Sequence, residues 1–394
     1  MRRENSFLLL IVIFTLLNPT LFPETRRIEE RISSPSPRIK ALGGKHAALA
    51  DDFTTLLNNP AGFQEAGPVM SLSEITMGVS GPIFDIAGVA IEGSQGDIGS
   101  VITSPDVIAL LQGLYSSMRV QGPISFGYVG RGLGFGFINN SNIVFSNNKP
   151  LTISVTAQEE IALCGGYSFR VPLPEKLLSK LDAGVLLKGF LRGETSIEKS
   201  FLQIPTLFTN FNTSLLTEEP FFVVTGIGFD VGIRYSFRDL IAFGIVGRDI
   251  FTPTLKSSYS NLTAFLENSE TPAKTNGLIP LDLSAGVMFT PELGRLRGYI
   301  DRLKIMLDYN DILDFLTHTA TSKHPILHIG LGIEAVILNI LSLRAGMYQG
   351  LFSAGLGLDL TFFTLNASMF GSELSSEPGL NPVYNLEVGL EFRL

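Results

Sequence analysis

The stretch from Thr225 to Tyr235, TGIGFDVGIRY, alternates between two kinds of side chain. One set is large and apolar, and the other is glycine with Asp230 and Arg234 as its charges. Alternation with a period of two is typical of a β-strand that has two different faces. The stretch therefore predicts a strand with one continuous apolar face and one small, sparsely charged face.

The same period recurs along the chain, for example in 281–289, 327–335, 354–360 and 385–394. A soluble β-sandwich also alternates and is the alternative fold, but its outer face is dense in Lys, Glu and Thr. A glycine-rich face instead suits the crowded, hydrated lumen of a membrane barrel, and an unbroken Leu/Phe/Val face suits lipid. We expect these charged residues to face the lumen: Lys188, Arg192, Asp230, Arg234, Asp282, Glu334, Arg344 and Asp359.

The composition agrees with a barrel. The 394 residues include 40 glycines and 29 phenylalanines, and the mean hydropathy is +0.30. No internal segment reaches the roughly 20 unbroken apolar residues of a transmembrane helix, so the apolar surface is spread over short strands. The formal net charge of −8 argues against a nucleic-acid partner. A single cysteine, Cys164, excludes an intrachain disulfide.

The alternating segments predict an all-β fold, a transmembrane antiparallel β-barrel of about 14 strands. The segment 69–91 is taken as one strand interrupted at Gly81-Pro82, because two strands there would place the termini at opposite ends. Tight turns are expected at one end and long loops at the other, as in outer-membrane barrels. The expected strands are 69–91, 119–129, 131–139, 152–169, 181–193, 222–236, 240–249, 281–290, 301–309, 326–336, 340–348, 351–360, 362–371 and 383–394, with long loops at 92–118, 194–220, 250–280 and 310–325.

The N-terminal part predicts export. Arg2 and Arg3 precede a short apolar core, so we expect residues 1–22 to be a secretory signal peptide. Residues 23–40 are charged and contain prolines, which indicates a flexible linker. We expect an N-terminal plug at 41–68 and the barrel at 69–394.

Within the plug, residues 43–58 read as a short amphipathic helix that ends at Asn59-Pro60, because proline disfavours helical geometry in the preceding residue. A lumen of this width is too large for its own glycine-rich lining to fill, so the helix is expected inside the barrel. Its acidic pair, Asp51 and Asp52, is expected to meet inward-facing cations. The candidates are Lys188, Arg192, Arg234 and Arg344.

The segment ALGGKHAALADDFTTLLNNPAGF, residues 41–63, resembles the N-terminal hatch of the FadL-like long-chain fatty acid outer-membrane transporters, a superfamily that includes porin-V-like proteins. The match lies in Ala50, Asp51, Asp52, Asn59, Pro60, Ala61 and Gly62. The resemblance implies a fourteen-strand barrel, a plug, and a substrate that leaves sideways into the membrane. It covers about twenty residues and does not fix the ligand.

We therefore expect outer-membrane uptake of hydrophobic or amphipathic small molecules, such as long-chain fatty acids, by binding at the barrel mouth and passive passage past the plug. The alternative is a non-transporting docking or assembly protein of the porin-V-like type. Apolar loop segments at 106–115, 201–211, 261–266 and 311–316 are expected either to offer a first docking site for an amphiphile or to pack on each other as a lid. The expected partners are hydrophobic small molecules and outer-membrane lipid, with no nucleic acid, and the barrel is expected to be a monomer.

We expect no enzymatic activity, no cofactor and no catalytic or metal site. The four histidines show no metal-ligand spacing with Cys or carboxylates. A lipid hydrolase using His318 and His324 is the remaining enzymatic hypothesis. Proline interrupts a ladder, so two Gly-Pro pairs, Gly81-Pro82 and Gly122-Pro123, are expected to open one lateral gap if their strands are neighbours.

Overall fold

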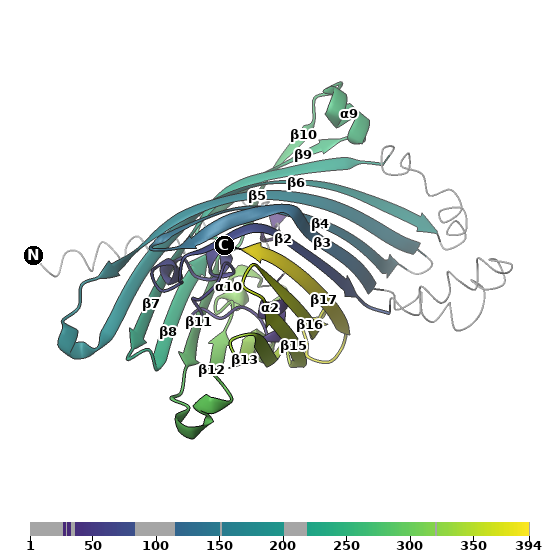
Figure 1. Cartoon of the computed structure of the whole chain (residues 1–394). Coiled ribbons are helices and arrows are strands. Elements are labelled where there is room, and N and C mark those ends of the chain that lie inside the picture. Colours follow the sequence, from purple (N-terminus) through teal and green to yellow (C-terminus); the bar gives the residue numbers. More distant parts are fainter. Residues whose placement is uncertain are drawn as a thin grey trace, which may run out of the picture.

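The computed structural model describes residues 27–28, 30–32, 36–82, 115–149, 152–200, 219–319 and 321–393. Its strands form one antiparallel wall that closes on itself through the pairing of β17 with β2 (Figure 1). The circuit β2–β8 followed by β11–β17 is a closed barrel of 14 strands, so the predicted strand number is confirmed. The barrel strands are β2 Val69–Ser80, β3 Tyr115–Gly130, β4 Leu133–Lys149, β5 Thr152–Val171, β6 Ser179–Ser200, β7 Phe221–Phe237, β8 Ile241–Arg248, β11 Asp282–Phe289, β12 Arg302–Tyr309, β13 Ile329–Ile337, β14 Leu341–Tyr348, β15 Leu351–Asp359, β16 Phe363–Glu373 and β17 Pro382–Arg393.

Two further strands extend the wall where a long loop was expected at 250–280. Strand β9 (Thr252–Tyr259) continues β8 along β7, and β10 (Ala273–Ile279) continues the β11 side, so the expectation of a loop is wrong there. Helix α9 (Leu262–Glu267) caps this hairpin, which projects from one end of the barrel (Figure 1). The short strand β1 (Arg27–Ile28) pairs in parallel with β10. Strands β6 and β4 also run beyond their predicted ends at 193 and 139.

The two faces of the wall follow the alternation. In β7, Ile227 is 66% exposed and Asp230 is 2% exposed, so the apolar set points outward and the charged set points into the lumen. Leu356 and Leu358 on β15 are likewise exposed. An outward belt of Leu, Ile, Val and Phe therefore surrounds a lumen lined with glycine and charge.

The connections differ between the two ends of the barrel. At the turn end, adjacent strands are joined by segments such as 131–132, 238–240 and 338–340. At the loop end lie α9 and α10 (Asp314–Thr317), and the connection before β13 ends in η6 (Pro325–His328). The single-turn helices η3 (Glu175–Leu177) and η5 (Gly294–Gly298) lie in turn-end connections. Among the described residues no helix is long and apolar enough to cross a membrane.

Residues 36–68, called here the N-terminal segment, contain three short helical pieces: α2 (Pro37–Ala41), α3 (Thr55–Asn58) and η2 (Pro60–Gln64). The predicted helix over 43–58 is wrong, because only its last four residues are helical. Gly43 has a φ of +79°, outside helical geometry, and Asn58 Nδ2 donates to the His46 carbonyl, so packing and side-chain bonds replace the helix. Part of the predicted linker at 23–40 is ordered, since it contains the buried residue Ser36 and all of α2 except Ala41.

Candidate functional site: the lumen and the N-terminal segment

The N-terminal segment crosses the lumen from one side of the wall to the other. Helix α2 contacts β14 to β17, and η2 contacts β3 to β7. A Cβ added to Gly244 would lie 2.1 Å from the Ala47 carbonyl oxygen, and one added to Gly184 would lie 2.5 Å from the Pro60 carbonyl. These lumen-facing glycines therefore allow the backbone of the segment to touch the wall.

Apolar contacts hold both halves of the segment. Around η2, Phe53, Leu56 and Phe63 pack with wall residues that include Ile138 and Leu186. Around α2, a second cluster is formed by the side chains Ile39, Leu42, Leu49 and Met306. Burial of such side chains stabilises the docked segment by roughly 1.5–3 kcal/mol for each one that is fully buried.

The residues that carry the family resemblance contact one another. Asn59 accepts from the Ala61 N–H at 3.0 Å, and its Nδ2 donates to the Ala47 carbonyl at 2.6 Å. A Cβ on Gly62 would lie 2.7 Å from the Ala50 Cβ, so the turn at Pro60 needs glycine there. Asn59, Ala61 and Gly62 thus give the N-terminal segment its shape.

The acidic pair of the motif binds a cation that the sequence analysis did not identify. The Arg38 guanidinium donates to Asp51 at 2.7 and 2.9 Å, to Asp52 at 2.5 Å and to Glu334 at 2.7 and 2.8 Å. Lys304 on β12 pairs with Asp51 as well. Burial raises the pKa of Asp51, but Arg38 and Lys304 outweigh burial and hold that pKa well below its ordinary value.

Arg344 completes this group, called here the Arg38 network. It donates to Glu334 at 2.8 Å and to Asn366 at 2.7 Å. Three cations (Arg38, Lys304 and Arg344) then face three carboxylates (Asp51, Asp52 and Glu334), so the network is balanced. A buried ionic group is stable when its charges are paired and its hydrogen bonds are satisfied.

The expected partners of Asp51 and Asp52 have other contacts, and the predicted pairing is wrong in its identities. Lys188 pairs with Asp230 at 2.8 Å, and Arg192 pairs with Glu160 at 2.5 Å. Arg234 donates to the Ala48 carbonyl at 2.9 Å, and Arg344 reaches the network only through Glu334. Alternation identifies which residues face the lumen but not which residue lies opposite.

The two remaining candidate lumen charges, Asp282 and Asp359, differ in position. Asp282 lies in the lumen and accepts from Arg248 at 2.9 Å. Asp359 lies at the turn end, where its side chain is 38% exposed and pairs with Arg393. Two sequence patterns could have identified the missed partners. Ser36-Pro37 is a helix-start pattern, which predicts a helix containing Arg38. Alternation along β12 predicts that Lys304 faces the lumen.

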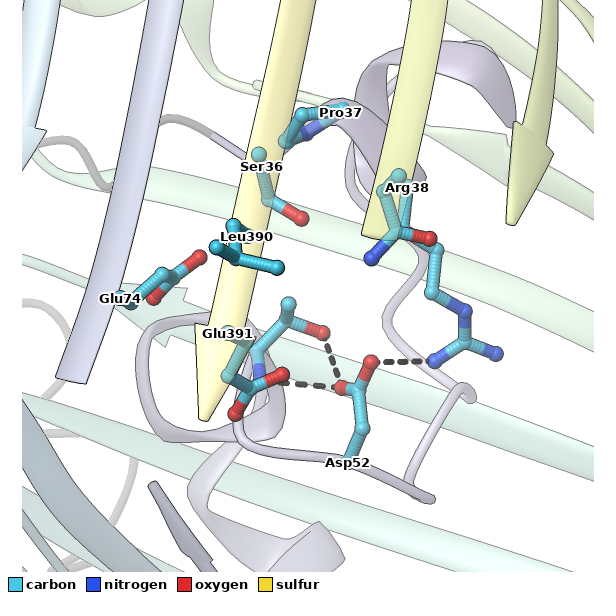
Figure 2. Close-up of a pocket in the computed structure, with 10 residues that line it drawn as sticks. Ser36, Pro37, Arg38, Asp52, Glu74, Leu390 and Glu391 are labelled. Atoms are coloured by element: carbon cyan, nitrogen blue, oxygen red, sulfur yellow. Dashed lines mark hydrogen bonds and ion pairs between the residues drawn. The ribbon is translucent and has the colours of Figure 1, made fainter. Parts of the chain in front are cut away.

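A small cavity lies where the N-terminal segment meets β16, β17 and β2 (Figure 2). Its volume is about 20 Å³, the space of about one water molecule. Glu74 and Glu391, which are paired across β2 and β17, face it beside Asp52. Asp52 also accepts from Arg38 (Figure 2) and from the Thr54 N–H, so the cavity is polar and largely acidic.

Gly122-Pro123 lies within β3, whereas Gly81-Pro82 directly follows the end of the neighbouring strand β2, and the two pairs do not form one gap. Gly122 and Pro123 make a bulge in β3, where the register with β4 shifts between Gln121 and Phe126. The Gly122 backbone packs on the Glu74 carbonyl, whereas the Gly81 backbone packs on the Tyr115 carbonyl. Gly81 comes seven positions after Glu74, about 23 Å at strand spacing, so the expectation of a shared opening is wrong.

No family model and no curated protein matches the sequence. Among solved structures, the chain is similar to the CymD monoaromatic hydrocarbon channel, with a TM-score of 0.48 and 11% identity over 91% of this chain and 96% of that one. It is similar to the Pseudomonas putida toluene transporter TodX, with a TM-score of 0.47 and 12% identity over 94% and 99%. A Pseudomonas aeruginosa FadL homologue is similar with a TM-score of 0.42 and 12% identity over 90% and 97%. These three structures are thus a monoaromatic hydrocarbon channel, a toluene transporter and a FadL homologue.

Proposed function

We propose that this chain is an outer-membrane β-barrel of the FadL-like superfamily, exported through a signal peptide at 1–22 and working as a monomer. The support is physical. Over the described residues the 14 barrel strands form a closed ring, their outward side chains are apolar, and their charges point inward. This arrangement suits lipid outside and a polar lumen inside.

We further propose that residues 41–68 act as a plug. They fill the lumen between opposite walls, and they are held both by apolar clusters and by the Arg38 network. The ionic part of this attachment, the Arg38 network, can open, because its charged groups regain hydration when they separate. The segment can then leave the wall locally without unfolding the barrel.

The proposed activity is uptake of hydrophobic or amphipathic small molecules, such as long-chain fatty acids, by passive passage past the plug. The observation that carries this proposal is the position of the β3 bulge. Gly122 packs on Glu74, and Glu74 lines the cavity at the edge of the N-terminal segment. When the N-terminal segment loosens beside Glu74, a hydrophobic molecule that passes it reaches the bulge of β3 at Gly122. From this bulge it crosses to the membrane side of the wall.

Uptake by cells that lack their own transporter tests this function. Cells expressing the chain should accumulate a labelled long-chain fatty acid or a labelled aromatic hydrocarbon faster than cells with empty vector, while a labelled sugar should show no difference. Replacing Pro123 by Val restores a ladder donor and should reduce uptake. Pro291→Val, at the turn end, is the matched control and should leave uptake unchanged.

A docking role is the second candidate, and one observation favours it. On the projecting hairpin, the ring of Phe265 lies 5.2 Å from the rings of both Phe221 and Tyr259, and Leu266 is 71% exposed. An exposed apolar tip of this kind suits a protein partner. Absence of uptake for every labelled compound, with correctly folded protein, would favour docking over transport.

A further inference from the structure

The connection between β12 and β13 at the loop end gathers two aspartates and two histidines. One ligand atom from each of Asp311, Asp314 and His318 lies within 4.8 Å of the others. The Asp314 carboxylate is 2.8 Å from Nδ1 of His318 and 3.4 Å from Nε2 of His328. Asp314 therefore lies between two imidazoles, with a second carboxylate beside it.

The backbone fixes these four side chains in place. Asp314 and His318 are four residues apart at the two ends of α10 and so share one face. Asn310 N–H donates to the His328 carbonyl at 2.8 Å, which joins the two ends of the connection. The His328 ring also lies against Tyr309, with centroids 5.7 Å apart. Three of these residues, Asp311, Asp314 and His318, thus have ligand atoms within 4.8 Å of one another, and His328 joins them through Asp314.

One carboxylate of the group, Asp311, has an oxygen without a hydrogen-bond partner. Asp311 Oδ1 is buried and has no hydrogen-bond partner among the described residues, and the Arg31 guanidinium is 3.7 Å from Oδ2. A cation placed among Asp311, Asp314 and the imidazoles would give that oxygen a partner.

The donor chemistry selects the kind of cation. Two imidazole nitrogens and two carboxylate oxygens are the ligands of zinc and related first-row divalent metals, with bonds of roughly 2.0–2.2 Å. Ligand atoms around such a tetrahedral ion lie about 3.4 Å apart. Asp314 already lies 3.4 Å from His328, and its 2.8 Å hydrogen bond to His318 would lengthen when an ion enters. Calcium and magnesium prefer an all-oxygen set and fit these ligands less well.

We propose that Asp311, Asp314, His318 and His328 form a binding site for a first-row divalent transition metal of the Zn²⁺ type. The bound ion ties the loop-end connection between β12 and β13 into one fixed arrangement. This site is separate from the Arg38 network, and it holds whether or not the barrel transports hydrophobic molecules.

Calorimetric titration with Zn²⁺ tests the site, using the full chain in detergent, without a polyhistidine tag and after chelator treatment. The intact chain should bind one equivalent. His318→Ala and Asp314→Asn each remove a ligand and should raise the Kd at least about tenfold. The matched control is His324→Ala, an exposed histidine of the same connection, which should leave the Kd unchanged.

Two checks keep the test decisive. The mobility shift between heated and unheated samples on a gel reports whether each variant barrel is folded. The visible absorption of Co²⁺ bound in place of Zn²⁺ should show nitrogen and oxygen ligands in a tetrahedral site, and the band should vanish in His318→Ala. No binding by the intact folded chain, or equal loss of affinity in His324→Ala and His318→Ala, would overturn the proposal.

Discussion

Replacing Arg38 by Met should release the N-terminal segment from the wall. The change keeps most of the side-chain volume but removes the guanidinium, and it leaves Asp51, Asp52 and Glu334 with two cations instead of three. Removal of one partner from a buried ionic group costs about 3–5 kcal/mol. Asp51 and Asp52 retain 23% and 20% exposure, so the lower end applies, and the undocked population should rise by a factor of about 10².

The assay is maleimide labelling of a cysteine at a buried position of the segment. In a background in which Cys164 is replaced by Ser, Ser36→Cys exchanges oxygen for sulfur at a site that is 6% exposed. When opening and closing are fast, the labelling rate follows the open population, so Arg38→Met should raise it about 10²-fold. Arg302→Met, on the exposed end of β12, is the control and should not change it.

A double variant separates charge from packing. Glu334→Gln added to Arg38→Met removes one carboxylate that the first change left uncompensated, so part of the protection should return. Equal labelling rates in the intact chain and in Arg38→Met would refute the reasoning, because the segment would then be held without the Arg38 network.

Three further outcomes are expected. Leu356→Arg, on the outer face near the middle of β15, should lower the free energy of unfolding in lipid vesicles by about 2–4 kcal/mol in urea titrations, whereas Leu358→Arg, near the turn end, should cost less. Burial and Arg248 lower the pKa of Lys45 to about 7 in the docked segment. Between about pH 7 and 10 the undocked segment therefore binds more protons than the docked one, so docking should tighten as the pH rises through this range. Lys45→Met should remove this pH dependence of the labelling rate. Because the pKa of Asp51 is depressed, its contribution should be complete above about pH 4, the ordinary pKa, and should fade only below it, which labelling between pH 6 and 3 would check.

Alternation was enough to predict the wall, because each strand must present one face to an apolar medium and the other to a polar lumen. That constraint acts on every residue of β7 or β15, so strand positions and facing followed from the sequence. This two-faced constraint does not act on strands β9 and β10. They carry Lys256, Lys274 and several Ser and Thr residues, and they lie in a hairpin that projects beyond the wall.

The contents of the lumen were harder to predict, for a physical reason. The conformation of residues 43–58 depends on contacts with glycines from distant strands, such as Gly244, and those contacts override local helix preference. The partners of Asp51 lie 13 and 253 residues away, and no local pattern encodes such distances. The group around Asp314 was missed similarly, because His328 joins it only when β12 and β13 pair.

The central claim is that hydrophobic molecules pass the barrel only when the N-terminal segment moves, and a reversible lock measures this directly. Ser353 Oγ donates to the Ala41 carbonyl at 3.0 Å, so these residues of β15 and α2 are neighbours. The lock is a cysteine pair at these positions in the Cys164→Ser background, and the oxidised form is the fraction in which their disulfide is detected. Uptake of a labelled long-chain fatty acid should be low in the oxidised variant and should return to the level of the single variants after reduction. Equal uptake by the oxidised and reduced forms, with the crosslink verified by mass spectrometry, would contradict the account.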